Sequence, residues 1–282
     1  MELQPMEQVI ELALKKKKIL NDSFVRYLMR AALSGIYIGF GIMLSFRLGE
    51  GFFEIHSPVA SIMTSIFFGI ALILIIYGGS ELFTGNTMYF TMSTLNKATS
   101  WKDTMQNWFA CYLGNLIGAV FFALLVMSSG LFSSLESSQL LMATAAHKMD
   151  GTTFELFFRA ILCNWVVCLA VWLPMHVKGD MAKITVMMLL VFAFVASGFE
   201  HSIANMVTFS IALSVPHPVT ITLIGAIHNL IPVTIGNIIG GGLFVGGMYV
   251  YLSSPAKQKQ HLELTNNKTK TMKPSFLRKV KA

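Results

Sequence analysis

Apolar runs of about twenty residues recur along this 282-residue chain, and they constrain the fold more than any other feature. A run of that length is long enough to cross the hydrocarbon core of a bilayer as a single helix. Hydrophobic residues make up 54% of the sequence and charged residues only 12%, so little of the chain is suited to a water-soluble surface. The chain is therefore predicted to be a polytopic, all-α membrane protein.

Hydropathy predicts six membrane-spanning segments, at residues 25–48, 60–95, 104–130, 153–175, 184–214 and 219–252. The second and fifth are too long for one simple crossing, and each contains a short polar stretch. The chain then divides into an N-terminal amphipathic cytoplasmic helix over residues 1–22, a six-helix transmembrane domain over 23–252 and a basic cytoplasmic tail over 253–282. The first segment does not resemble a cleaved signal, since its lysines follow the short apolar stretch instead of preceding it.

The net charge of +7 is unevenly distributed along the chain. Lysines cluster at Lys15–Lys18 and in the tail from Lys257 to Lys281, which favours a membrane surface over a nucleic-acid partner. Basic residues occupy the second and fourth connections, whereas the other short connections contain only Lys148. The positive-inside rule then predicts a multi-pass protein of the cell membrane with both termini in the cytoplasm.

Few residues suggest metal binding or catalysis. Cys111, Cys163 and Cys168 all lie in apolar segments without the spacing of a metal or redox site, so we interpret them as small packing residues. Glu200 and His201 are suited to act as acid and base, but neither a nucleophile nor a second histidine at helical spacing accompanies them. We expect neither a cofactor nor an enzymatic activity.

The second half of the chain repeats features of the first. The stretch YLGNLIGAVFF in the third segment resembles TIGNIIGGGLF in the sixth, and the polar stretches GGSELFTGN and SGFEHSIAN show a similar offset. Three spans repeated twice must enter the membrane in opposite orientations. An inverted 3+3 repeat with a broken helix in each half indicates a site near the midplane, formed by the two breaks.

The two polar stretches carry the candidate chemistry. Glu81 and Glu200 are interpreted as structural residues that brace the breaks, and Asn205 lies one helical turn after His201. An ionisable group at membrane depth usually faces a cavity, and an imidazole titrates near neutrality. We therefore expect His201 to present charge or a proton to an anion, with a purely structural histidine as the alternative.

Four segments make the chain resemble the formate/nitrite transporter family over nearly all of residues 5–252. They are GGSELFTGNTM, CNWVVCLAVW, ASGFEHSIANM and HNLIPVTIGNIIGGG. The resemblance implies an aquaporin-like six-helix protomer with broken second and fifth helices, and a homopentamer in which each protomer has its own pore. It also implies a transmembrane channel for small anions.

By position in these motifs, the resemblance assigns Thr84 and His201 as the central polar pair, with Asn164 and Asn205 as polar neighbours. Lys148 matches a family lysine thought to attract anions at the mouth, with a solvated surface lysine as the alternative. Apolar residues would bracket the pair in two constrictions, one of Leu82, Phe83 and Phe194 and the other of Phe68, Leu72 and Val167.

The expected substrate is a small monovalent weak-acid anion. Gly85 after Thr84 and the sequence CNW at Cys163–Trp165 resemble the nitrite branch more than the formate branch. Nitrite is therefore expected first, with formate or hydrosulfide as alternatives, because protonation would remove most of the cost of crossing an apolar passage. An aquaporin-like pore for neutral solutes is another alternative, although the paired NPA motifs of that class are absent.

Overall fold

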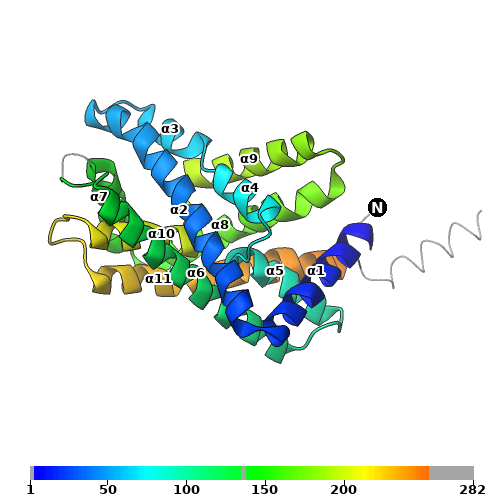
Figure 1. The fold of residues 1–282 in the computed structure, drawn as a ribbon. Coiled ribbons are helices and arrows are strands. Elements are labelled where there is room, and N and C mark those ends of the chain that lie inside the picture. Colours follow the sequence, from blue (N-terminus) through cyan, green and yellow to red (C-terminus); the bar gives the residue numbers. More distant parts are fainter. Residues whose placement is uncertain (1–2, 135–137, 254–282) are drawn as a thin grey trace, which may run out of the picture.

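The computed structural model describes residues 3–134 and 138–253, and every regular element within those ranges is a helix (Figure 1). The prediction of a basic tail therefore lies outside the described residues, apart from its first position. The helices are α1 Leu3–Asp22, α2 Phe24–Glu54, α3 Ala60–Ile66, α4 Ile70–Tyr77, α5 Phe83–Leu95, α6 Trp101–Ser129, α7 Gln139–Asp150, α8 Thr153–Trp172, η2 Leu173–His176, α9 Asp180–Ala196, α10 Ser202–Ser214, α11 Leu223–Ile238, η3 Ile239–Gly247 and α12 Met248–Leu252.

Five helical stretches of the described chain are long and apolar enough to cross a membrane. They are Phe24–Glu54, Ala60–Tyr77, Trp101–Ser129, Thr153–His176 and Leu223–Leu252. The remaining predicted span is divided into α9, with 17 residues, and the shorter apolar helix α10, with 13. Both predicted polar interruptions fall between helices, one between α4 and α5 and the other between α9 and α10.

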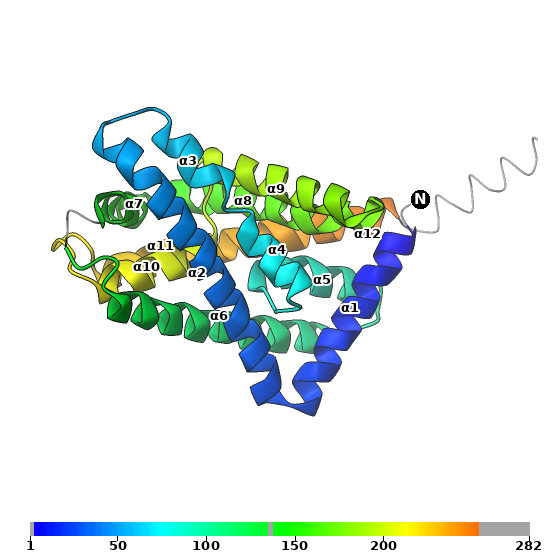
Figure 2. The same cartoon turned by 45° about the horizontal axis from the view of Figure 1, so that its top comes forward.

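A different helix lies at each end of the molecule. Helix α1 lies at one end together with the end of α12, and α7 lies at the opposite end (Figures 1 and 2). Helices α6, α8 and α11 run between these two ends, and α1 meets α2 in a V (Figure 2). The described chain therefore begins and ends on the same side of the molecule.

Helix boundaries follow from local capping chemistry. Ser23 accepts the Arg26 N–H at the start of α2. A capping box of Ser100 and Asp103 starts α6, and one of Thr152 and Glu155 starts α8. Each box satisfies backbone donors that an α-helix leaves without a partner at its first turn. These caps fix where α2, α6 and α8 begin.

Small residues allow the long helices to approach one another closely. A Cβ on Gly118 of α6 would lie 1.9 Å from the carbonyl oxygen of Ala32 in α2. In the second half, a Cβ on Gly240 of η3 would lie 2.3 Å from the carbonyl oxygen of Ile161 in α8. Both glycines belong to the repeated GN stretches, and they permit the backbone contacts that pack helices in a membrane.

We predict that Gly118→Ala destabilises the protein, because the new methyl group overlaps backbone that cannot move without separating α2 from α6. The expected loss is about 1–3 kcal/mol, in the range of overpacking substitutions. Thermal unfolding in detergent would measure it, as a lower midpoint than for the unmodified protein. The matched control is Gly51→Ala, since a Cβ on Gly51 meets nothing within 4 Å. Equal midpoints for the two variants would contradict the prediction.

Candidate functional site

Two breaks interrupt apolar helices, and they use the same backbone geometry. The first covers residues 78–82 and the second covers residues 197–201. Each turns through a glycine in the left-handed region, Gly79 at φ +65° and Gly198 at φ +68°. A side chain at either position would be strained, so both turns require glycine. The breaks release backbone groups that must find partners without the help of bulk water.

An asparagine of α6 satisfies the first break. The Asn115 side chain accepts the Phe83 N–H at 3.0 Å and donates to the carbonyl oxygen of Glu81 at 2.8 Å. It also donates to the carbonyl oxygen of Ala31 at 2.8 Å, which ties the break to α2. Asn115 is fully buried, so each of these hydrogen bonds replaces one that water would otherwise make.

A second asparagine, from α11, satisfies the second break in the same way. The Asn237 side chain accepts the Ser202 N–H at 2.8 Å and donates to the carbonyl oxygen of Glu200 at 2.9 Å. It also donates to the carbonyl oxygen of Ala160 at 2.8 Å, which ties the break to α8. These are the asparagines of the two repeated GN stretches, so the repeat serves the breaks directly.

A buried carboxylate within each break pairs with a lysine. Glu200, about 2% exposed, pairs with Lys148 of α7 at 2.9 Å and accepts a hydrogen bond from Asn205. Glu81, about 1% exposed, pairs with Lys16 of α1 and accepts a hydrogen bond from Asn86. Both glutamates therefore have compensated charges, as buried ions require.

The two breaks differ most at the residue that begins the following helix. His201 caps α10, since its Nδ1 accepts the Ala204 N–H at 3.1 Å, whereas Leu82 occupies the matching position before α5 and makes no side-chain cap. The other ring nitrogen, Nε2, lies 3.1 Å from Oγ1 of Thr84. The structure thus brings the predicted central pair into direct contact, although 117 positions separate them in the sequence.

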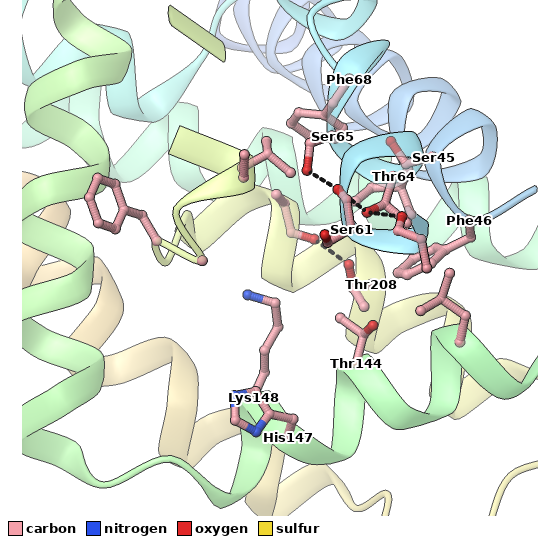
Figure 3. A pocket seen from close by; sticks show the side chains of 18 of the residues that line it. Ser45, Phe46, Ser61, Thr64, Ser65, Phe68, Thr144, His147, Lys148 and Thr208 are labelled. Carbon is pink, nitrogen blue, oxygen red and sulfur yellow. Dashed lines mark hydrogen bonds between the residues drawn. The ribbon is translucent and has the colours of Figure 1, made fainter. Parts of the chain in front are cut away.

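A cavity of about 810 Å³, here called the vestibule, is shown in Figure 3, and its lining includes His201 but not Thr84. Lys148 reaches into it from α7, with hydroxyl-bearing side chains across from it (Figure 3). His201, Asn205 and Arg159 of α8 are among the residues that line it. Several of the facing hydroxyls already donate to helical carbonyls, as Ser65 does to Ser61 at 2.6 Å. The vestibule therefore carries hydroxyl and cationic groups within a lining that is otherwise largely apolar.

A second cavity of only about 20 Å³, here called the neck, shares Phe68, Phe194 and His201 with the vestibule. That volume is close to what a single water molecule requires. The neck is apolar, and Phe68 and Phe194 meet there edge to face with ring centroids 6.1 Å apart. Members of both predicted constrictions line this one cavity together with His201, instead of forming two separate sets, namely Phe68, Leu72, Leu82, Val167 and Phe194.

Some predicted site residues lie outside the vestibule and the neck. Phe83 packs its ring against Tyr112, with centroids 5.0 Å apart, and its N–H is held by Asn115. Asn164 donates to the carbonyl oxygens of Thr84 and Asn237, at 3.2 and 2.6 Å. In this structure Asn164 therefore links the first turn of α5 to α11, and it is absent from the residues lining the two cavities.

Sequence reasoning missed several residues that build the site. Lys16 was seen only as part of a basic cluster, and Asn115 and Asn237 only as part of a weak repeat. Arg159 was overlooked within the predicted fourth span. The sequence does contain an indication of its role, because an arginine inside an apolar span is expected to face a cavity or a partner.

Comparisons with known proteins agree with these features. A family model described as formate/nitrite transporter matches residues 4–251. The uncharacterized transporter YwcJ of Bacillus subtilis is 50% identical over 253 residues, covering 90% of this chain and 99% of its own. The nitrite transporter NirC of Salmonella typhimurium is 38% identical over 247 residues, covering 84% of this chain and 89% of its own.

Solved structures give the same result. A chain described as an FNT family ion channel superposes with a TM-score of 0.83 at 35% identity, covering 89% of this chain and 99% of that one. A pentameric formate channel with formate bound superposes with a TM-score of 0.71 at 30% identity, covering 82% of this chain and 99% of that one.

We predict that Asn237→Leu destabilises the protein, because a side chain of similar size removes the side-chain partners of the Ser202 N–H and the Glu200 carbonyl oxygen at the buried break. Unsatisfied buried groups of this kind cost about 1–3 kcal/mol each, so a total near the lower end of their sum is expected. Thermal unfolding in detergent would measure it. Asn96→Leu is the control, since Asn96 is exposed at the end of α5. A midpoint for Asn237→Leu as high as that of the control would contradict the structural role.

Proposed function

The chain belongs to the formate/nitrite transporter family, and from that membership together with the geometry of its site we propose that it conducts the anions of small weak acids. It is a multi-pass membrane transport protein and not an enzyme. We propose nitrite as the main substrate, with formate or hydrosulfide as the alternatives. The finer architecture that we propose is an aquaporin-like inverted repeat of six spans in a homopentamer.

One observation carries this proposal: His201 lies between a large cavity that carries cationic groups and a small apolar neck. The imidazole is only 5% exposed, lines both cavities and contacts Thr84. A charged solute can remain solvated in the vestibule, but it would lose its water in the neck. An anion that can accept a proton avoids that cost, because it crosses the neck as a neutral acid. This favours weak-acid anions over chloride.

The hydrogen bonds of His201 specify how it would act. Its Nδ1 accepts the Ala204 N–H, so the proton of a neutral ring lies on Nε2, which faces Thr84. The hypothesis of a proton-lending imidazolium needs a proton on both nitrogens, and a proton on Nδ1 would face another donor. The contact therefore favours a neutral ring that shares its Nε2 proton in a hydrogen bond with the anion. The proton that neutralises the anion would then come from the vestibule water.

The sidedness of the pathway completes the proposal. We place the α1 end in the cytoplasm, as the positive-inside rule predicts, and the vestibule on the outer side with α7. Lys148 would attract the anion there while it remains paired with Glu200. The relatives named for nitrite and formate transport differ in substrate, so the choice between these anions depends on direct measurement.

We predict that His201→Asn keeps most of the anion flux and its pH dependence, whereas His201→Leu abolishes both. Asparagine can cap α10 and donate a hydrogen bond, but leucine can do neither. In both the wild type and the Asn variant, flux should rise as pH falls, since the neutral-acid concentration grows by about tenfold per pH unit above the acid's own pKa. Uptake of nitrite, formate, hydrosulfide and chloride into liposomes across a pH series would measure this.

The same liposome experiment separates the competing functions. A pH-independent flux in His201→Asn would show that the histidine itself carries the proton. Equal chloride and nitrite flux in the wild type would contradict the neutral-acid pathway. Osmotic swelling without anion uptake would replace the proposal with a pore for neutral solutes.

We also predict that Leu82→Ala weakens selectivity, because it removes apolar volume from the neck and lets water accompany the solute. Chloride uptake should increase relative to nitrite uptake in the same liposomes. The control is Leu116→Ala, since Leu116 is 37% exposed on the outer surface of α6. A neck variant that excludes chloride as well as the wild type does would show that the selective barrier lies elsewhere.

A further inference from the structure

The two breaks differ in the number of cationic side chains that pair with their buried glutamate. At the first break, Glu81 faces two cations, Lys16 and Arg30, the latter with its Nε 3.7 Å from the carboxylate. At the second break, the described residues give Glu200 only one cationic partner, Lys148, at 2.9 Å. The charges of Lys148 and Glu200 therefore largely cancel inside the vestibule.

Arg159 occupies the place in the second half that Arg30 occupies in the first. The main-chain carbonyl of Arg30 accepts the Glu81 N–H at 3.2 Å, and that of Arg159 accepts the Glu200 N–H at 3.4 Å. Their side chains differ, since Arg159 lines the vestibule and its ion pair within the described residues is with Glu155, at 3.9 Å. This makes Arg159 a cation of the vestibule that no buried carboxylate neutralises.

The pair with Glu155 is weak by every physical criterion. Glu155 is 52% exposed, and its Oε2 is already used to cap α8 through Thr152. Exposed pairs at this spacing contribute little to stability. The Arg159 side chain is 38% exposed, and its backbone lies about 9 Å along α8 from the first residue, given a rise of about 1.5 Å per residue. An arginine kept this far inside a span without a strong partner indicates a ligand.

We infer that Arg159 is a specificity-determining residue that binds planar oxyanions in the vestibule before they reach His201. This inference rests on the proposed transport function. The guanidinium presents parallel N–H donors that match two oxygens of one anion, and nitrite and formate both offer such a pair. Hydrosulfide and chloride offer a single atom and gain only from the charge. Arg159 therefore selects nitrite and formate from these simpler anions.

The test compares the half-saturating concentrations of nitrite, formate and hydrosulfide for uptake through the full-length protein in right-side-out vesicles. Arg159→Lys keeps the charge but not the paired donors, so it should raise the values for nitrite and formate by about fivefold. Hydrosulfide should change by less than about twofold. Arg159→Gln removes the charge as well, and should raise the values for nitrite and formate by about tenfold or more. Arg26→Lys, at an exposed position near the opposite end, is the matched control.

A second variant keeps the test decisive if the Arg159 variants do not accumulate in the membrane. Glu155→Gln preserves the capping box, since glutamine also serves at that position, and it removes the competing carboxylate. It should lower the half-saturating nitrite concentration by about twofold. An unchanged or higher value would overturn the inference, as would equal effects of Arg159→Lys on all three anions or no effect on any. If the unmodified protein transports none of them, the proposed function itself fails.

Discussion

The architecture depends on the satisfaction of backbone groups that two helix breaks release inside a membrane protein. Each break exposes N–H and carbonyl groups that a continuous helix would pair within itself, and lipid provides no hydrogen-bond partners for them. Asn115 and Asn237 supply the missing partners, each with one acceptor and two donors directed at a break and a neighbouring helix. Because these asparagines fix the breaks, they also fix the ends of α5 and α10. Thr84 and His201 lie at the starts of these two helices, so their contact depends on the same asparagines.

The two breaks differ at the residue that begins the following helix, and the proposed function depends on that difference. Glycine turns, asparagine anchors and lysine-paired glutamates appear in both breaks, yet Leu82 stands where His201 stands in the other half. One half therefore contributes an apolar side chain to the neck, and the other contributes an imidazole whose Nε2 contacts Thr84. A fully symmetric pair of leucines would give a dry barrier, and a pair of histidines would give a polar passage open to ions. The mixed pair is suited to the proposed passage of a neutral acid.

The sequence predicted the parts of this structure that local patterns encode, and missed those that depend on distant contacts. Recurrent apolar runs indicated the spans, and the polar stretches with Gly79 and Gly198 indicated both breaks. The contact of Thr84 with His201 came only from the family resemblance, because no periodicity connects residues that far apart. Phe83 was expected in a constriction, but the start of α5 directs it toward Tyr112. Which face a residue presents at a helix break depends on the turn, and the apolar pattern does not record the turn.

Capture of an anion and its passage through the neck place opposite demands on the same pathway. A site that binds charge strongly would hold the anion, and a neck that excludes charge would reject it. The structure separates these demands along the pathway, with cationic groups in the vestibule and apolar residues beyond His201. The pairing of Lys148 with Glu200 limits how strongly the vestibule can hold an anion, since most of that charge is already compensated. Under our proposals, an anion would be oriented by the guanidinium of Arg159, reach the Nε2–H of His201, and leave the vestibule only once a proton has removed its charge.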